Sequence, residues 1–130
     1  MADEAGPILV VDQDDDGRSL MGSILEGAGF RTARVASGES ALDVARSTAP
    51  RLALVDVFLP GLTGYETCHE LKAELGQSFP VVLVSRTDRK AVDAVAAFLL
   101  KVDECVAKPL RSEDVLAGVQ RLLARSSEAA

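Results

Sequence analysis

The chain has 130 residues, of which 48% are hydrophobic and 26% charged, and its formal net charge is −6 at pH 7. This length and composition are typical of one globular domain with one core. We therefore expect a single domain over residues 1–130, with its core at about 6–125 and a short tail at each end. The negative charge argues against direct binding of nucleic acid, which favours a basic surface.

Cysteine content and hydropathy exclude two further classes of protein. Two cysteines, Cys68 and Cys105, are too few for a disulfide framework, so we expect reduced thiols. No apolar run is long enough to cross a bilayer, and we expect a cytoplasmic protein without a membrane role.

Short apolar runs alternate along the chain with stretches whose apolar residues have helical spacing. We predict strands at 7–11, 30–36, 52–57, 80–85 and 105–107. We predict helices from about 16 to the glycines near 27–29, and at 37–45, 65–75, 88–100 and 112–125, with a frayed tail at 126–130. The third strand is apolar except for Asp56, which is typical of a strand buried on both faces of a parallel sheet.

Alternation of strands and helices at this spacing predicts a parallel sheet with helices on both faces and right-handed crossovers. The fold class that fits is α/β: a single doubly wound (βα)5 domain, flavodoxin-like, with a five-stranded parallel sheet of order 2-1-3-4-5. In that order strands 1, 3, 4 and 5 are neighbours, and a ligand crevice forms outside their carboxyl ends.

Four polar side chains lie at the carboxyl ends of these neighbouring strands: Asp12, Asp56, Ser85 and Lys108. Two carboxylates close together repel each other, and a hard divalent cation such as Mg²⁺ between them would relieve that repulsion. Lys108 is a point charge suited to phosphate oxygens, and Ser85 supplies a hydroxyl donor. An acid, a metal, a lysine and a hydroxyl around one phosphorus are the parts of phosphoryl transfer to a carboxylate.

These features closely resemble the receiver domain of bacterial two-component response regulators. The resemblance covers nearly the whole chain, with matching segments at 8–12, 54–61, 64–66 and 108–110. It implies a signalling phosphoprotein that accepts a phosphoryl group on Asp56 from a histidine kinase or a histidine phosphotransfer protein. It implies no enzyme activity beyond the domain's own phosphorylation and dephosphorylation. We expect a stand-alone receiver, a monomer or weak homodimer, that acts on a downstream protein partner.

The resemblance also implies roles around the phosphoacceptor. Mg²⁺ would be held by Asp12, Asp56 and the backbone carbonyl of Phe58. Lys108 would pair with the phosphoryl group, and its bond to Pro109 would be cis. Ser85 would be the switch residue that moves toward the phosphoryl group and converts a local charge change into a change at the surface.

The sequence departs from the family pattern at several positions. Gln13 stands where the family has a second metal-binding acid, so we expect a weak or lost metal ligand there and a lower Mg²⁺ affinity. Cys105 stands at the aromatic switch position that normally responds to Ser85. Arg86 replaces a small residue and is expected to lie in solvent, and 101–102 replace a small Gly-Ala turn.

Two alternative functions compete with the phosphoacceptor. The first is a pseudo-receiver, a protein-interaction module that works without phosphorylation. Gln13, Arg86 and Cys105 favour it, and it is opposed by the four intact site residues, Asp12, Asp56, Ser85 and Lys108. The second is a haloacid-dehalogenase-like phosphatase, because Asp12-Gln13-Asp14 resembles its Asp-x-Asp signature. That family needs a longer chain and a later acidic pair, which the residues after the fourth strand do not supply.

The remaining polar and aromatic residues have simpler interpretations. Asp15 and Asp16 are expected to serve the N-terminus of the first helix as cap and dipole partners. His69, the only histidine, is expected on an exposed helix face. We expect Phe98 to pack in the core, and Leu99 or Leu100 to be partly exposed, next to the surface that receiver domains use for partners and dimers.

Overall fold

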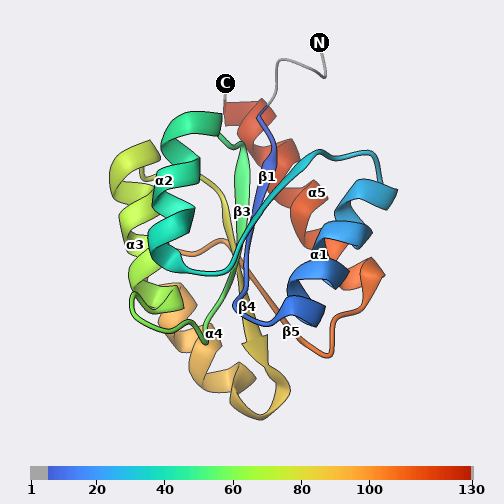
Figure 1. Ribbon diagram of the computed structural model, residues 1–130, viewed down its shortest axis with the longest axis vertical. Coiled ribbons are helices and arrows are strands. Elements are labelled where there is room, and N and C mark those ends of the chain that lie inside the picture. Colours follow the sequence, from blue (N-terminus) through green and yellow to red (C-terminus); the bar gives the residue numbers. More distant parts are fainter. Residues whose placement is uncertain (1–5, 130) are drawn as a thin grey trace.

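The structure is a computed structural model that describes the backbone of residues 6–129 and the side chains of residues 6–125. Five strands alternate with helices, as the sequence predicts (Figure 1). The strands are β1 (Ile8–Val11), β2 (Thr32–Val35), β3 (Leu52–Asp56), β4 (Val81–Arg86) and β5 (Glu104–Lys108). The helices are α1 (Asp15–Gly27), α2 (Gly38–Thr48), α3 (Gly64–Leu75), α4 (Lys90–Leu99) and α5 (Ser112–Ala129), and a 3-10 turn, η2 (Thr87–Arg89), precedes α4.

The sheet is parallel throughout, with strand order β2-β1-β3-β4-β5, and this confirms the predicted fold class and topology. The register sets the level at which each strand leaves the sheet. Val11 of β1 lies opposite Val55 of β3, so the next residues, Asp12 and Asp56, reach the carboxyl edge together. Chain segments more than 40 residues apart are thus held side by side by the pairing of β1 with β3.

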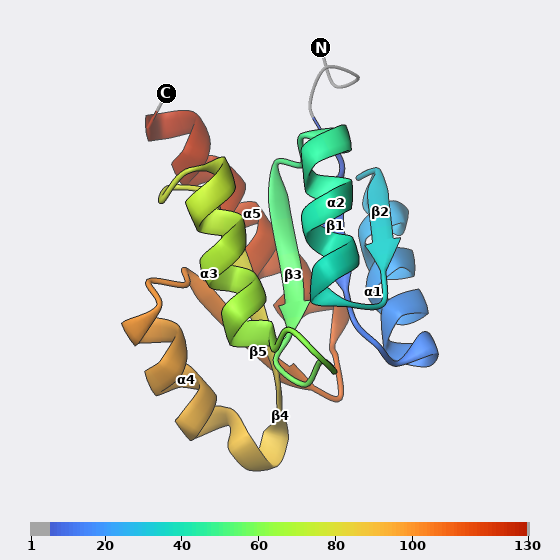
Figure 2. The same cartoon turned by 60° about the vertical axis from the view of Figure 1, so that its left-hand side comes forward.

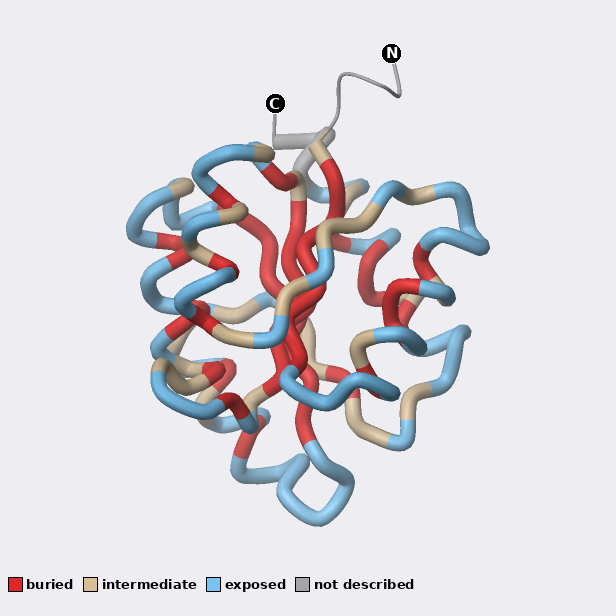
Figure 3. The backbone as a smooth tube through the Cα atoms, viewed as in Figure 1, coloured by how far each residue is buried: buried red, intermediate tan, exposed pale blue. Residues whose placement is uncertain are grey.

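Helices cover both faces of the sheet, α1 and α5 on one side and α2, α3 and α4 on the other (Figures 1 and 2). Successive strand residues supply the two cores in turn, with Leu54 in the α1–α5 cluster and Val55 in the α2–α3–α4 cluster. Figure 3 shows the buried backbone concentrated in the central strands. The strands can be apolar on both faces because neither face meets water.

The sequence signals for the ends of helices mostly act as expected, with differences at α1 and α5. The cap of α1 is Asp14, whose side chain accepts from Gly17 N, while Asp15 and Asp16 lie in the first turn. The prediction of a frayed tail at 126–130 is wrong as far as Ala129, because the backbone of α5 continues to that residue; residue 130 lies outside the described part.

The packing of α4 also differs from the prediction. Phe98 is 80% exposed and does not pack in the core, so that expectation is wrong, whereas the exposure of Leu99 is as expected. The helix instead buries Ala97 and Asp93 against the domain. Because α4 buries the small Ala97 and the polar Asp93, its larger apolar side chains are exposed to solvent. The helical spacing of apolar residues in the sequence does not by itself predict this.

Candidate functional site

Asp56 ends β3 and is 5% exposed. The backbone amide of Phe58 donates to its Oδ1 at 2.7 Å, which fixes one face of the carboxylate. Burial raises the pKa of Asp56, because the charged form loses water; hydrogen bonds from Lys108 and the Phe58 amide offset part of this shift. Gly64 lies so close behind that a Cβ there would be 2.2 Å from the Asp56 carbonyl oxygen, so the loop after β3 requires glycine.

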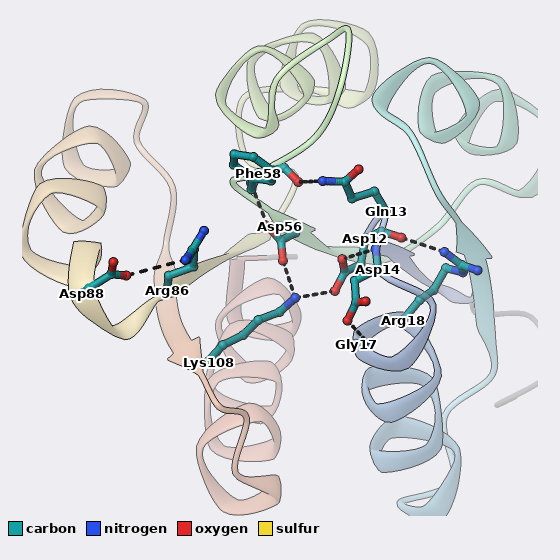
Figure 4. Close-up of polar contacts among 10 residues, drawn as sticks. All are labelled: Asp12, Gln13, Asp14, Gly17, Arg18, Asp56, Phe58, Arg86, Asp88 and Lys108. Atoms are coloured by element: carbon teal, nitrogen blue, oxygen red, sulfur yellow. Dashed lines mark hydrogen bonds and ion pairs between the residues drawn. The ribbon is translucent and has the colours of Figure 1, made fainter.

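Lys108 joins the two buried carboxylates of the site (Figure 4). Its Nζ lies 2.7 Å from Asp56 Oδ2 and 2.8 Å from Asp12 Oδ2. Burial disfavours the charge on Lys108, but hydrogen bonds to Asp12 and Asp56 outweigh it, and the pKa of Lys108 is raised. The Lys108–Pro109 bond is cis, as the resemblance implied. One ammonium thus balances part of two negative charges that the sheet register forces together.

The first turn of α1 closes the site from the side. A Cβ on Gly17 would lie 2.4 Å from Asp12 Oδ2 and 2.9 Å from Lys108 Nζ, so no larger residue fits there without a shift. Arg18 donates to the backbone carbonyl of Asp12 at 2.9 Å and pairs with Asp15. These contacts fix the turn that follows β1.

The position of Gln13 bears directly on metal binding. Its Nε2 donates to the carbonyl of Phe58 at 3.3 Å, the oxygen expected to face a metal (Figure 4). Asp14 does not replace the missing acid, because its side chain caps α1 and its amide donates to Asp12 Oδ1 at 2.9 Å. Among the described residues, no three or more histidine, cysteine, aspartate or glutamate side chains form a cluster that could hold a metal ion.

The oxygen donors that are present nevertheless suit a hard cation. Asp12, Asp56 and the Phe58 carbonyl could offer Mg²⁺ two carboxylates and a neutral oxygen, and this ion commonly keeps several waters. The donor set therefore fits Mg²⁺, with one anionic ligand fewer than the family pattern. A cation would have to compete with Gln13 for the Phe58 oxygen and with Lys108 for the carboxylates.

The expected switch residues lie on adjacent strands. Ser85, near the end of β4, is 1% exposed, and the Cys105 thiol donates to its Oγ at 3.8 Å, a weak contact. Burial raises the pKa of the Cys105 thiol, which keeps it protonated and unreactive. Arg86 is exposed, and its Nε lies 3.7 Å from Asp88; Figure 4 shows this pair beside the site, apart from the Asp56–Lys108 contact.

Sequence reasoning did not find two polar contacts close to the site. Tyr65, in the first turn of α3, donates its hydroxyl to the buried Asp93 of α4. Thr87 donates its hydroxyl to the carbonyl of Lys108. The sequence signal for the Tyr65–Asp93 contact was a single acid inside an otherwise Ala- and Val-rich helix, because a charged residue in such a position usually has a partner. His69 is exposed, as predicted.

Comparison with known proteins gives a consistent result. The family model described as "Response regulator receiver domain" matches residues 8–120. The DNA-binding response regulator MtrA of Mycolicibacterium smegmatis is 36% identical over 121 residues, which cover 93% of this chain and 52% of that protein. The alkaline phosphatase synthesis transcriptional regulatory protein PhoP of Bacillus subtilis is 34% identical, over 95% of this chain and 50% of that protein. The chain thus spans about half the length of the curated relatives it matches.

Solved structures agree with the sequence relatives. The receiver domain of NtrX from Brucella abortus superposes with a TM-score of 0.84 at 31% identity, covering 90% of this chain and 98% of that one. A putative response regulator from Chloroflexus aurantiacus gives a TM-score of 0.85 at 29% identity, over 92% and 98% of the two chains. No helix in the described part of the chain is long and apolar enough to span a membrane.

Proposed function

We propose a function from one premise: this chain belongs to the response regulator receiver domain family of two-component signalling. Within that family we infer that Asp56 is the phosphoacceptor, and that the donor is the phosphohistidine of a histidine kinase or of a histidine phosphotransfer protein. The observation that carries this proposal is the contact of Lys108 Nζ with both Asp12 and Asp56 at the carboxyl edge of the sheet. The domain is a signalling module whose only chemistry is its own phosphorylation and dephosphorylation.

In the proposed reaction, one Asp56 oxygen attacks the phosphorus of the partner's phosphohistidine. An O–P bond forms, the N–P bond breaks, and the imidazole leaves with the bonding pair and takes a proton from solvent. Lys108 offsets part of the cost that burial imposes on the charged Asp56 carboxylate, and its ammonium lies close enough to contact the new phosphoryl oxygens. Bound Mg²⁺ would supply further positive charge toward the same oxygens. Asp12, Asp56 and the Phe58 carbonyl are the residues that would hold it.

Ser85 is the proposed reporter of phosphorylation. It is buried at the adjacent strand end, and in the structure its hydroxyl accepts only a weak contact from Cys105. A phosphoryl group on Asp56 would offer strong acceptor oxygens for that hydroxyl. The small Cys105 replaces the aromatic side chain through which the family passes such a movement on. Phosphorylation of Asp56 therefore needs another route by which it can change the protein surface.

The surface proposed for the downstream partner is the outer face of α4. Val92, Val95, Phe98 and Leu99 are 59%, 61%, 80% and 73% exposed and lie at helical spacing on one face. Apolar groups of this size gathered on one exposed helix are typical of interaction sites. We propose that a protein with an apolar, uncharged surface covers them; the cytoplasm would be the place of that encounter. The relatives' DNA-binding activity is not assigned to this chain, whose net charge is −6.

A second candidate function is the pseudo-receiver, and the contact that favours it is Gln13 Nε2 donating to the Phe58 carbonyl. This bond satisfies an expected metal ligand from within the chain, so the Phe58 carbonyl has a partner without a cation. In that case Asp56 is a structural acid held by Lys108, and the domain presents α4 to its partner at all times.

The deciding experiment is the intact mass of the protein after incubation with acetyl phosphate, over a series of Mg²⁺ concentrations. The expected result is the gain of one phosphoryl group that depends on Mg²⁺ and is absent in Asp56→Asn. Asp16→Asn, which removes an exposed acid of the same region, is the matched control and should be phosphorylated normally. No gain at any Mg²⁺ concentration, and none with a panel of purified histidine kinases, would support the pseudo-receiver instead.

A further inference from the structure

Helix α4 has an inverted distribution of polarity. Its one acid, Asp93, is 1% exposed, whereas its large apolar residues point into solvent. An ionisable side chain in a buried position is costly unless a partner satisfies it. The partner of Asp93 therefore determines which face of α4 turns inward, and with it the face that is shown to other proteins.

That partner is the hydroxyl of Tyr65, the only tyrosine of the chain, which donates to Asp93 Oδ1. Burial, and then the bond to Asp93, raise the pKa of Tyr65 to about 12, so the phenol stays protonated and remains a donor. The contact joins the first turn of α3 to the first turn of α4, across 28 residues of sequence. It is a direct bond between the two helices.

Tyr65 is also tied firmly to the loop of the phosphoacceptor. It follows Gly64, whose amide donates to the carbonyl of Val57 at 3.2 Å. A Cβ on Gly64 would touch the Asp56 carbonyl oxygen, so the backbone before Tyr65 packs directly against that of Asp56. A displacement of the 56–58 segment must therefore move the Tyr65 backbone as well, because close-packed backbone does not deform continuously.

The Asp93 carboxylate also acts on one of the two switch positions, Cys105. Burial raises the pKa of Cys105, and the Asp93 carboxylate adds to that shift, which places Asp93 within electrostatic reach of the thiol. The thiol in turn contacts Ser85 Oγ. Tyr65, Arg89 and Asp93 line one surface hollow of 290 Å³, and the Arg89 guanidinium offsets part of the rise in the pKa of Tyr65. Asp93 thus has a second possible donor four residues earlier in sequence.

We propose that Tyr65 and Asp93 are positioning residues that couple the phosphoacceptor loop to α4, in place of the aromatic side chain that is absent at position 105. With the Tyr65–Asp93 bond intact, α4 is held with its apolar face outward. When the loop moves, Asp93 exchanges the neutral hydroxyl for the guanidinium of Arg89, and α4 adopts a second position. This coupling rests on the proposed phosphorylation of Asp56, whereas the bond itself exists without it.

The test is hydrogen–deuterium exchange of the α4 amides, Lys90–Leu99, measured with and without acetyl phosphate and Mg²⁺. Tyr65→Phe removes only the hydroxyl; it should speed α4 exchange about tenfold in the unphosphorylated protein and leave α2 unchanged. Asp93→Ala should act in the same way, with little further effect in the double variant. Asp93→Asn keeps an acceptor for the phenol and should preserve most of the protection. Asp88→Asn, an exposed acid of the same segment, is the matched control.

Measurements on the phosphorylated protein distinguish a coupling role of the Tyr65–Asp93 bond from a purely structural one. In the wild type, phosphorylation should change α4 exchange, and in Tyr65→Phe this response should be lost although the mass shows a full phosphoryl group. Unchanged exchange in unphosphorylated Tyr65→Phe would overturn the bond as the determinant of α4 position. Faster exchange with an intact response to phosphorylation would overturn the coupling and leave only a structural contact. A wild-type mass that never increases would instead contradict the proposed function, and with it the coupling.

Discussion

Lys108 Nζ lies 2.7 Å from Asp56 Oδ2, and this contact connects the last residue of β5 to the last residue of β3. The strand between them, β4, sets the separation, so the contact follows from the order of the sheet. Asp12 lies on the far side of Asp56 and shares the same ammonium at 2.8 Å. The structure therefore holds two carboxylates and one ammonium together at a largely buried site. Burial of these charged groups lowers the stability of the fold and makes the site reactive.

The first prediction concerns the cost of ionising Asp56. Because the fold raises the pKa of Asp56 above its ordinary value of 3.8, the folded protein binds this proton more tightly than the unfolded chain. The resulting stability is full below pH 3.8 and is lost as the pH rises through the folded pKa. Asp56→Asn should therefore raise the free energy of unfolding at pH 7 by about 1 kcal/mol. Urea unfolding of the wild type and of Asp56→Asn at a series of pH values measures this difference in the free energy of unfolding.

The same experiment has an internal check. The advantage of Asp56→Asn should shrink as the pH falls into the range where Asp56 is protonated in the folded protein. Asp16→Asn, an exposed acid, should show no such pH-dependent gain. A lower stability of Asp56→Asn at pH 7 would mean that the Lys108 contact outweighs burial, contrary to the direction of the pKa shift.

Sequence patterns were sufficient for the fold and for the convergence of the polar strand ends. Alternation of strands and helices predicts a doubly wound parallel sheet, and the strand order of that fold brings Asp12, Asp56 and Lys108 to one edge. Sequence patterns were insufficient where a single long-range contact accompanies the burial of one side chain of a helix. We expect Phe98 in the core from the sequence, whereas α4 buries Ala97 and Asp93, the partner of Tyr65, and leaves Phe98 exposed. Such a contact between helices carries no periodic signal.

The second prediction concerns the cation. Gln13→Asp should tighten Mg²⁺ binding by about tenfold or more, because it adds an anionic oxygen and removes the donor that now satisfies the Phe58 carbonyl. Isothermal titration calorimetry on the unphosphorylated protein measures this affinity. Asp14→Asn is the matched control, since asparagine still caps α1 and the affinity should change less than about twofold. An equal affinity in wild type and Gln13→Asp would place position 13 outside the coordination shell.

The third prediction concerns the turn after α4. Lys101 has a φ of 59°, in the left-handed region that favours glycine. Lys101→Gly should therefore stabilise the domain by about 0.5–1 kcal/mol, visible as a higher thermal midpoint. Lys101→Ala removes the same charge but keeps the strain, so it should not reproduce the gain. If both variants gained equally, the lysine charge and not the backbone conformation would be the cause.

The last prediction concerns the exposed face of α4. Phe98→Ser should change the free energy of unfolding by less than about 0.5 kcal/mol, because Phe98 is 80% exposed. Leu71→Ala, in the core between α3 and the sheet, should cost about 2–5 kcal/mol in the same assay. Phe98→Ser should nevertheless weaken association through this face, because it removes the largest apolar contact available there. Sedimentation velocity of the wild type and of Phe98→Ser at increasing concentration measures association between copies of the chain. A Phe98→Ser variant as destabilised as Leu71→Ala would show that Phe98 packs in the core of the folded domain.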